Sequence, residues 1–226
     1  MAINLKEVKF AYNTPKKKIA PKFILNDINL SIESQDEFIT LVGQSGAGKS
    51  TLVQLLNGLL LSNYGEVVVF DKTLSNNKKL KLKDTRKRVG LVFQFPEYQL
   101  FEETVLKDIM YGPKNFGFSD DEAKKAAIGI AERLNIKSIL DASPFNLSGG
   151  QMRKVAIAGI LAYEPDVLLL DEPTRGLDPL GAKEIMAFFK ELQTKYNKTI
   201  IMISHDMDLV YEYATRCIVL QNGEMV

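Results

Sequence analysis

The sequence predicts an α/β fold, in which a mainly parallel core sheet is flanked by helices and joined by an N-terminal antiparallel β part and a helical insertion. The first observation is a glycine-rich turn between an apolar strand-like segment, Glu37–Val42, and a leucine-rich helix-like segment, Thr51–Leu60. The second is a pair of buried-strand patterns, Val167–Leu170 and Thr199–Ser204, each followed by ionisable side chains. Continuous apolar runs are typical of central parallel strands, because helices cover both faces of such a sheet.

The composition is that of an ordinary globular protein. The chain has 226 residues, of which 46% are hydrophobic and 25% charged, so it could form one large domain or two small ones. Its net charge of +1 argues against a chain built mainly to neutralise nucleic acid. No apolar run approaches the roughly 20 residues of a membrane span, and Met1–Tyr12 lacks a signal-peptide core. We therefore expect the chain to stay in the cytosol.

The chain has one cysteine, Cys217, which excludes an internal disulfide and a cysteine cluster for zinc. It lies in the apolar run Cys217–Leu220, where we expect a buried structural thiol.

The N-terminal part predicts β structure, because Ile3, Leu5, Val8 and Phe10 alternate loosely and Phe23–Ile32 follows with a second strand pattern. Tyr12 closes the first strand. Its ring could be half-buried at the strand end, or it could be a stacking platform for a base.

The glycine-rich turn from Gly43 to Ser50 matches the eight-position phosphate loop. Glycines let successive backbone N–H groups curl around phosphate oxygens, and the following helix points its positive end at the same anion. Lys49 would reach the β- and γ-phosphates of a nucleotide, and the Ser50 hydroxyl would ligate Mg²⁺. The full loop comprises Gly43, Gln44, Ser45, Gly46, Ala47, Gly48, Lys49 and Ser50.

A lysine- and arginine-rich run extends from Lys72 to Arg88. It contains no aromatic residue, so it offers no side chain on which the bases of a nucleic acid could stack. We expect a solvated basic face and no nucleic-acid partner.

The segment from Phe95 to Ala162 is mainly helical in pattern and predicts a helical insertion, with a capping box formed by Ser119 and Glu122. Near its end, two glycines open the helix Met152–Tyr163, which makes a second phosphate-ready helix start in the same chain. This start comprises Ser148, Gly149, Gly150 and Gln151.

Polar side chains follow three of the predicted strands. Gln94 ends the strand Val89–Phe93, Asp171 and Glu172 end the apolar run at Leu170, and His205 follows Ser204. Ligands of α/β sheets bind beyond the carboxyl ends of the strands, so these groups could converge on one crevice. Asp171 suits the Mg²⁺-supporting acid of a phosphate-loop enzyme, and Glu172 suits the group that orients or deprotonates water.

At the C-terminal end, Asn222-Gly223 is a strong signal for a hairpin turn, and only Glu224, Met225 and Val226 follow it. A hairpin usually has a longer return strand, so we expect this chain to be a truncated form of a longer protein.

Taken together, these motifs resemble those of the nucleotide-binding subunits of ATP-binding-cassette (ABC) transporters, and the resemblance covers essentially the whole chain. It implies a P-loop NTPase fold of the ABC type, a single domain over residues 1–226 with a helical subdomain at about 95–165, and ATP and Mg²⁺ as cofactors. By resemblance, Ser50, Gln94 and Asp171 support the metal, Glu172 is the catalytic carboxylate and His205 the switch histidine. The ATP-binding residues would be Tyr12, which stacks on adenine, the whole loop Gly43–Ser50, Thr51 and Gln94.

The resemblance also implies that Ser148–Gln151 is a signature motif that acts on the nucleotide of a partner subunit, and that Gly176–Asp178 is the D-loop. Arg175 departs from the family, which usually has a small residue there, so the contacts of this loop stay open.

Two longer runs, Phe93–Phe101 and Ser148–Gly159, resemble the ATPase subunits of energy-coupling-factor (ECF) importers for vitamins or transition-metal ions. Such subunits hydrolyse ATP as a sandwich dimer, here a homodimer or, more in keeping with the family, a heterodimer. Their other partners are a transmembrane coupling protein and a substrate-binding membrane protein, which implies a peripheral place on the cytoplasmic face of the membrane. Phe95, Tyr98 and Phe101 could form the docking surface, or they could be core residues of the insertion.

Two other functions stay open: the ATPase of another ABC importer, and a soluble ABC ATPase that acts on nucleic acid or ribosomes. The second class usually carries tandem cassettes or a long coiled-coil insertion, whereas this chain has one cassette and a short helical insertion. The sequence does not name the transported solute.

Overall fold

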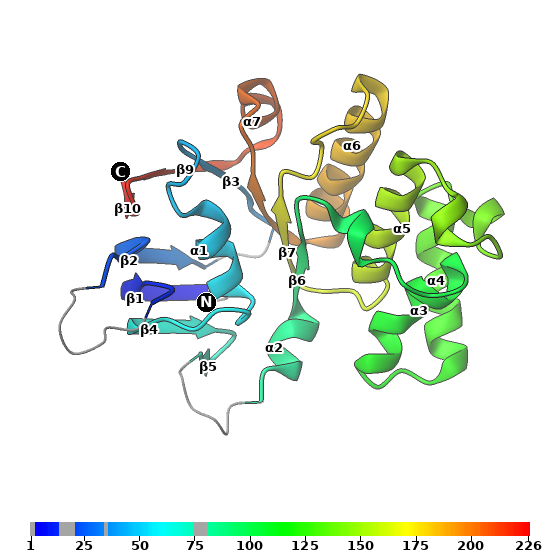
Figure 1. Ribbon diagram of the computed structural model, residues 1–226, viewed down its shortest axis with the longest axis horizontal. Coiled ribbons are helices and arrows are strands. Elements are labelled where there is room, and N and C mark those ends of the chain that lie inside the picture. Colours follow the sequence, from blue (N-terminus) through cyan, green and yellow to red (C-terminus); the bar gives the residue numbers. More distant parts are fainter. Residues whose placement is uncertain (1–2, 14–20, 34–35, 75–80) are drawn as a thin grey trace.

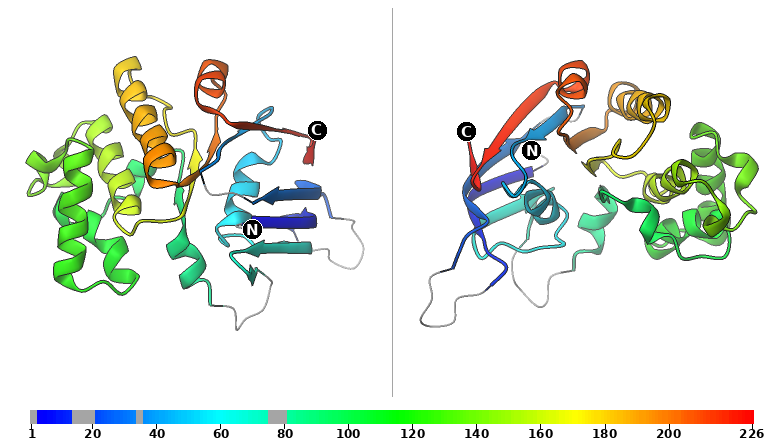
Figure 2. Two further views of the ribbon diagram at one scale, coloured as in Figure 1. Left: turned by 180° about the vertical axis from the view of Figure 1, so that it is seen from behind. Right: turned by 45° about the horizontal axis from the view of Figure 1, so that its top comes forward.

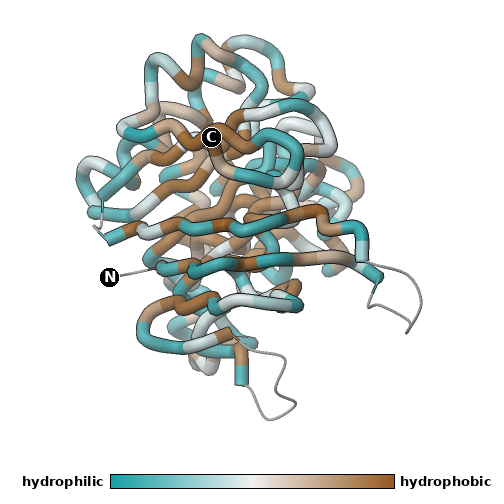
Figure 3. The backbone as a smooth tube through the Cα atoms, turned by 90° about the vertical axis from the view of Figure 1, so that its left-hand side faces the viewer, coloured by the Kyte–Doolittle hydropathy of each residue, from teal (hydrophilic) through white to brown (hydrophobic). Residues whose placement is uncertain are grey.

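The computed structural model describes residues 3–13, 21–33, 36–74 and 81–226, arranged as two sheets with helices between and around them (Figure 1). The antiparallel sheet has the strand order β2-β1-β4-β5. Its strands are β1 (Ile3–Phe10), β2 (Leu25–Ile32), β4 (Tyr64–Val69) and β5 (Lys72–Thr73). Hydrophobic and hydrophilic residues alternate along much of β1 and β2, because one face packs on the core and the other meets solvent (Figure 3).

The core sheet has the strand order β10-β9-β3-β8-β7-β6. All its described neighbours pair in parallel except β10, which pairs antiparallel with β9. The strands are β3 (Phe38–Val42), β6 (Val89–Val92), β7 (Val167–Asp171), β8 (Thr199–Ile203), β9 (Arg216–Gln221) and β10 (Glu224–Met225).

Helices cover both faces of the core sheet (Figure 2). They are α1 (Lys49–Leu56), α2 (Lys83–Arg88), α3 (Val105–Asn115), α4 (Asp120–Arg133), α5 (Gly149–Leu161), α6 (Pro179–Tyr196) and α7 (Met207–Tyr213). Three short 3₁₀ helices, η1 (Pro96–Gln99), η2 (Lys137–Ile139) and η3 (Pro144–Asn146), join them within the described chain. The chain between β6 and β7 is therefore helical, and the predicted α/β fold class is confirmed.

Two hydrophobic clusters explain why the central strands are mostly apolar. Val167 and Leu169 of β7 pack with α1 and the antiparallel sheet, whereas Leu168 and Leu170 pack with the helices on the opposite face. Each face of the strand is thus buried.

Local signals in the sequence match the structure at several helix and strand ends. Ser119 and Glu122 form the predicted capping box at the start of α4. Asn222 and Gly223 both have positive φ and form the predicted turn between β9 and β10.

The prediction that Cys217 is buried is wrong, because its side chain is exposed. Ile218 and Leu220 point into the core, so the alternation along β9 places Cys217 on the opposite, exposed side of the strand. An apolar run of four residues was therefore only half-buried.

The basic run lies partly in α2, where the lysine and arginine side chains are exposed or half-exposed, as predicted. Its residues 75–80, which include two of the lysines, lie outside the described residues. Among the helices of the described ranges, none is both long and apolar enough to cross a membrane.

Candidate nucleotide-binding site

The phosphate loop joins β3 to α1 and requires glycine at defined positions. Gly48 caps α1 with φ of 103°, and a Cβ there would lie 2.7 Å from Leu25 Cδ2. A Cβ on Gly43 would lie 2.1 Å from the carbonyl oxygen of Leu220. The first turn of α1 carries no acidic side chain, so its N–H groups and positive helix end remain available to an anion.

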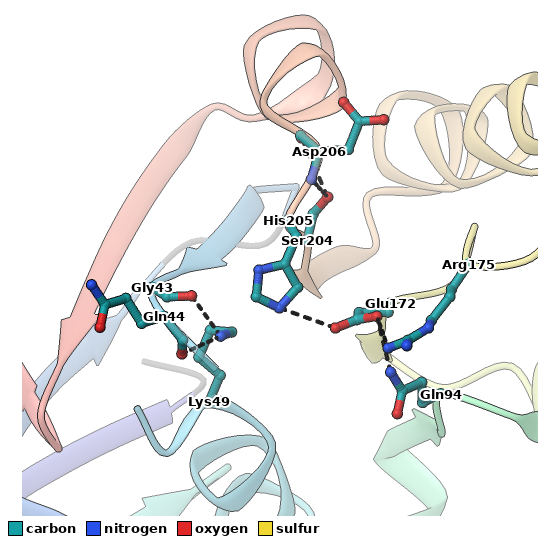
Figure 4. A network of polar contacts seen from close by, with 9 residues as sticks. All are labelled: Gly43, Gln44, Lys49, Gln94, Glu172, Arg175, Ser204, His205 and Asp206. Atoms are coloured by element: carbon teal, nitrogen blue, oxygen red, sulfur yellow. Dashed lines mark hydrogen bonds and ion pairs between the residues drawn. The ribbon is translucent and has the colours of Figure 1, made fainter. Parts of the chain in front are cut away.

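Lys49 is buried, and its ammonium group lies back on the loop that would hold the phosphates. Nζ donates to the carbonyl oxygen of Gly43 at 2.7 Å and to that of Gln44 at 3.0 Å (Figure 4). Burial lowers the pKa of Lys49, and the charges of Glu172 and Asp171 oppose that change. The side chain is thus a desolvated cation at the centre of the loop.

Asp171, the last residue of β7, accepts a hydrogen bond from the Ser50 hydroxyl. Burial raises the pKa of the Asp171 carboxyl, and the neighbouring charge of Glu172 adds to this effect, while Ser50, Lys49 and His205 oppose it. A half-buried carboxylate in this position favours a nearby cation.

Glu172 lies at the centre of a polar network (Figure 4). Its Oε2 accepts from Gln94 Nε2 at 2.9 Å and from Arg175 Nη1 at 2.9 Å, and its Oε1 lies 3.1 Å from His205 Nε2. Burial alone would raise the pKa of Glu172, but the hydrogen bonds from Gln94 and Arg175 and the charges of Arg175 and His205 outweigh it and hold the pKa below its ordinary value. The backbone of Glu172 has φ of 49°, a left-handed conformation that is uncommon for a glutamate.

These groups share one cleft of about 480 Å³ at the carboxyl ends of β3, β6, β7 and β8. The structure thus brings together side chains that are up to 160 positions apart in the sequence. A larger hollow of about 870 Å³ lies against the antiparallel sheet, but it contains none of the motif residues. The residues of the candidate site that line the smaller cleft are Ser45, Gly46, Gly48, Lys49, Ser50, Thr51, Gln94, Asp171, Glu172 and His205.

Tyr12 lies beside the start of α1, where its hydroxyl is 3.2 Å from Thr51 Oγ1. The side chain is 61% exposed, so it is not the half-buried strand-end residue that was one of its two interpretations. Its ring contacts Phe10 edge to face and otherwise offers a free surface next to the cleft.

The signature-like residues lie apart from this cleft. Ser148 caps α5 and forms a capping box with Gln151, and the two glycines between them are exposed. Together with Leu177 and Asp178, this helix start lines a separate depression of about 370 Å³. The two anion-ready helix starts of this chain therefore do not face one ligand.

Sequence reasoning missed a buried ion pair that ties three segments together. Arg153 of α5 donates from Nη2 to Glu97 Oε1 at 3.2 Å and to the carbonyl oxygen of Gln94 at 3.4 Å, and from Nη1 to the carbonyl oxygen of Arg175. The one signal that could have revealed it is a charge within the otherwise apolar face of the helix.

The residues present fit a magnesium nucleoside triphosphate. The glycines let the loop pack closely on Leu220 and Leu25 while its backbone N–H groups stay available to phosphate oxygens, and its lysine is the cation that phosphates need. Beside it, the Ser50 hydroxyl and Asp171 carboxylate already lie within hydrogen-bond contact, and oxygen ligands of this kind are those that Mg²⁺ prefers. Fold and site together define a phosphate-loop nucleotide-binding protein.

Comparisons with known proteins identify the family. The family model described as ABC transporter matches residues 25–175. The energy-coupling factor transporter ATP-binding protein EcfA2 of Streptococcus pneumoniae is 50% identical over 235 residues, which covers 100% of this chain and 80% of the relative. The EcfA2 protein of Clostridium perfringens is 50% identical over 230 residues, which covers 100% of this chain and 79% of the relative.

Two solved structures have the same fold. The cbiO1 protein of Clostridium perfringens, part of the ABC transporter complex cbiONQ, superposes with a TM-score of 0.85 at 35% identity, over 100% of this chain and 86% of that one. The ATP-binding cassette MJ0796, solved as a dimer bound to ADP and Pi, superposes with a TM-score of 0.86 at 29% identity, over 99% of this chain and 96% of that one. The chain therefore belongs to the ABC transporter family, and the two energy-coupling factor transporter ATP-binding proteins named above match it over its whole length.

Proposed function

We propose that this chain is the ATP-hydrolysing subunit that powers an energy-coupling factor importer for vitamins or transition-metal ions. The observation that carries the proposal is the convergence of the phosphate loop with Gln94, Asp171, Glu172 and His205 in one cleft. The names of the relatives favour this role over other ABC ATPases. In this proposal residues 1–226 act as one cassette, with residues 95–165 as its helical subdomain.

The phosphate loop binds the triphosphate through its backbone N–H groups, and Lys49 moves from the carbonyl oxygens of Gly43 and Gln44 to the phosphate oxygens. Tyr12 stacks on the adenine ring. Ser50, Gln94 and, through water, Asp171 would hold Mg²⁺, which would neutralise the charge that develops on the phosphate oxygens. The raised pKa of Asp171 fits this role, because burial disfavours the charged carboxylate and a cation bound nearby would stabilise it.

Glu172 orients the attacking water and accepts its proton, and His205 contacts the γ-phosphate. In the structure both side chains engage each other, at 3.1 Å between His205 Nε2 and Glu172 Oε1. The described side chains of the site thus satisfy one another, so ATP binding has to exchange these internal contacts for contacts to the nucleotide.

Two subunits form the complete site. Ser148–Gln151 is exposed and lies apart from the phosphate loop of its own chain, so it suits the nucleotide of a partner. The similarity to a cassette solved as a dimer with ADP and Pi supports this arrangement. We favour a non-identical cassette as the partner.

Four aromatic side chains that follow Gln94 in the sequence are exposed and contact one another in two pairs, Phe95 with Tyr98 and Phe101 with Tyr111; we call these four residues the aromatic patch. Tyr98 is 83% exposed, so the alternative that these residues form the core of the insertion is wrong for it and for its exposed neighbours. Aromatic residues are enriched at the centre of protein interfaces. The patch therefore suits a transmembrane coupling protein, which would place the chain on the cytoplasmic face of the membrane together with a substrate-binding membrane protein.

Nucleotide binding tests the proposal. We expect Lys49→Ala to weaken binding of a fluorescent ATP analogue by the purified complex at least about tenfold, because a charge-assisted contact to phosphate is lost. Lys195→Ala is the matched control, since it removes an exposed lysine from the far end of α6. Unchanged ATP affinity in Lys49→Ala would refute the assigned site.

A further inference from the structure

Arg175 lies three residues after Glu172, in the turn between β7 and α6, where the resemblance to the family implies a small residue. Its side chain is 56% exposed, yet its Nη1 lies 2.9 Å from Glu172 Oε2. A long cation thus occupies this position and reaches the neighbouring carboxylate.

Several contacts aim the Arg175 side chain at Glu172. The Arg175 N–H donates to the carbonyl oxygen of Glu172 at 3.1 Å, and its own carbonyl oxygen accepts from the buried Arg153. The guanidinium carbon lies 5.8 Å from the ring centroid of Phe95, within the range of a cation–π contact. The backbone is therefore fixed, and the exposed side chain is the part that is free to swing.

The ion pair takes up an oxygen that Glu172 needs for its proposed role. A carboxylate oxygen has two lone-pair directions, and Oε2 already accepts from both Gln94 and Arg175. On the other oxygen, Oε1 faces His205. With both oxygens engaged by protein groups, Glu172 cannot place Oε2 on a water molecule without losing one of its donors (Figure 4).

Building on the proposed function, we propose that Arg175 is a positioning residue that holds Glu172 in a resting orientation, and that the Arg175–Glu172 ion pair opens before Glu172 engages water. Gln94 is held by the same oxygen, so opening of the pair also makes it easier for Gln94 to turn toward the metal. Arg175 slows the hydrolytic step. Its side chain lines the nucleotide cleft, but among the described hydrogen bonds and ion pairs none joins it to the phosphate loop.

Single-turnover hydrolysis, with the assembled complex in excess over ATP, measures the step in question. We expect Arg175→Ala to raise the single-turnover rate about two- to fivefold, the range that corresponds to the strength of one exposed ion pair. The dissociation constant for the fluorescent ATP analogue is measured on the same variant, so that a change in binding is separated from a change in the hydrolytic step. Arg175→Lys keeps a cation within reach of Glu172 and returns the rate toward wild type, and the control Lys195→Ala leaves it unchanged.

A rate in Arg175→Ala that is equal to or below the wild-type rate would overturn the inference, as would failure of Arg175→Lys to slow the reaction again. Thermal unfolding of both variants checks that the exposed substitution leaves the fold intact. Glu172→Gln, alone and combined with Arg175→Ala, separates this inference from the proposed function. If Glu172→Gln hydrolyses ATP at the wild-type rate, the proposed catalytic carboxylate is wrong; if it is inactive and Arg175→Ala is not faster, the inference about Arg175 alone fails.

Discussion

The buried contact between Arg153 and Glu97 predicts a large loss of stability when one partner is removed. The side chain of Arg153 is 5% exposed and that of Glu97 is 16% exposed, so Arg153→Met would leave a mostly buried carboxylate without its cation. Methionine has a similar length and fills the space without charge. The carbonyl oxygens of Gln94 and Arg175 would also lose a donor.

Removal of one partner from a buried ion pair costs 3–5 kcal/mol in general, and the residual exposure of Glu97 places this case at about 3 kcal/mol. For a protein of this size, such a loss lowers the melting temperature by about 6–12 °C. Urea unfolding followed by circular dichroism measures the free energy, and Lys137→Met is the control. Lys137 forms an exposed ion pair with Glu132, so its loss should cost less than about 1 kcal/mol.

A double-mutant cycle tests the physical reason. Glu97→Gln in the Arg153→Met background removes the unpaired charge, so we expect the double variant to be more stable than the sum of the two single losses predicts, by about 1–2 kcal/mol. Strictly additive losses, or a loss below about 1 kcal/mol for Arg153→Met, would refute the assignment of a buried, coupled pair.

Two further predictions concern pH and docking. Burial raises the pKa of Asp108 despite its hydrogen bonds from the backbone N–H groups of Phe101 and Glu102, so the folded state holds this proton more tightly than the unfolded state. Wild type should therefore lose stability relative to Asp108→Asn as pH rises from about 4 toward 7, measured by urea unfolding across that range, and a difference that is independent of pH would contradict the shift. Phe101→Glu should reduce recovery of the membrane subunit in a pull-down, because it puts a charge in the aromatic patch, whereas Tyr211→Glu, at an exposed tyrosine of α7, should not. Equal recovery with both variants would remove the docking role.

Much of the site could be predicted because its residues follow strand ends. Asp171 ends a parallel strand, and Gln94 and His205 follow shortly after the ends of two others. The geometry of a parallel sheet brings such positions to one edge whatever separates them in the sequence. Local signals were equally informative at Ser119, where a capping box starts α4, and at Asn222-Gly223, where the turn needs positive φ.

The contacts that sequence reasoning could not supply join side chains from different segments. Arg153 meets Glu97 across 56 positions, and nothing in either local pattern says which charge a buried arginine will find. Cys217 shows the same limit, because an apolar run predicts a strand but does not say whether one face of the strand or both faces are buried. The reach of Arg175 to Glu172 depends on a turn geometry that residue types alone do not fix.

Whether Glu172 drives ATP hydrolysis is tested most directly by the turnover of the assembled complex with Glu172→Gln in this chain. The amide keeps the shape of the side chain but cannot accept the proton of water, so we expect ATP binding to stay near the wild-type value and single-turnover hydrolysis at this site to fall by about 10²–10⁴. Hydrolysis at the wild-type rate with unchanged ATP binding would contradict the proposed role of Glu172.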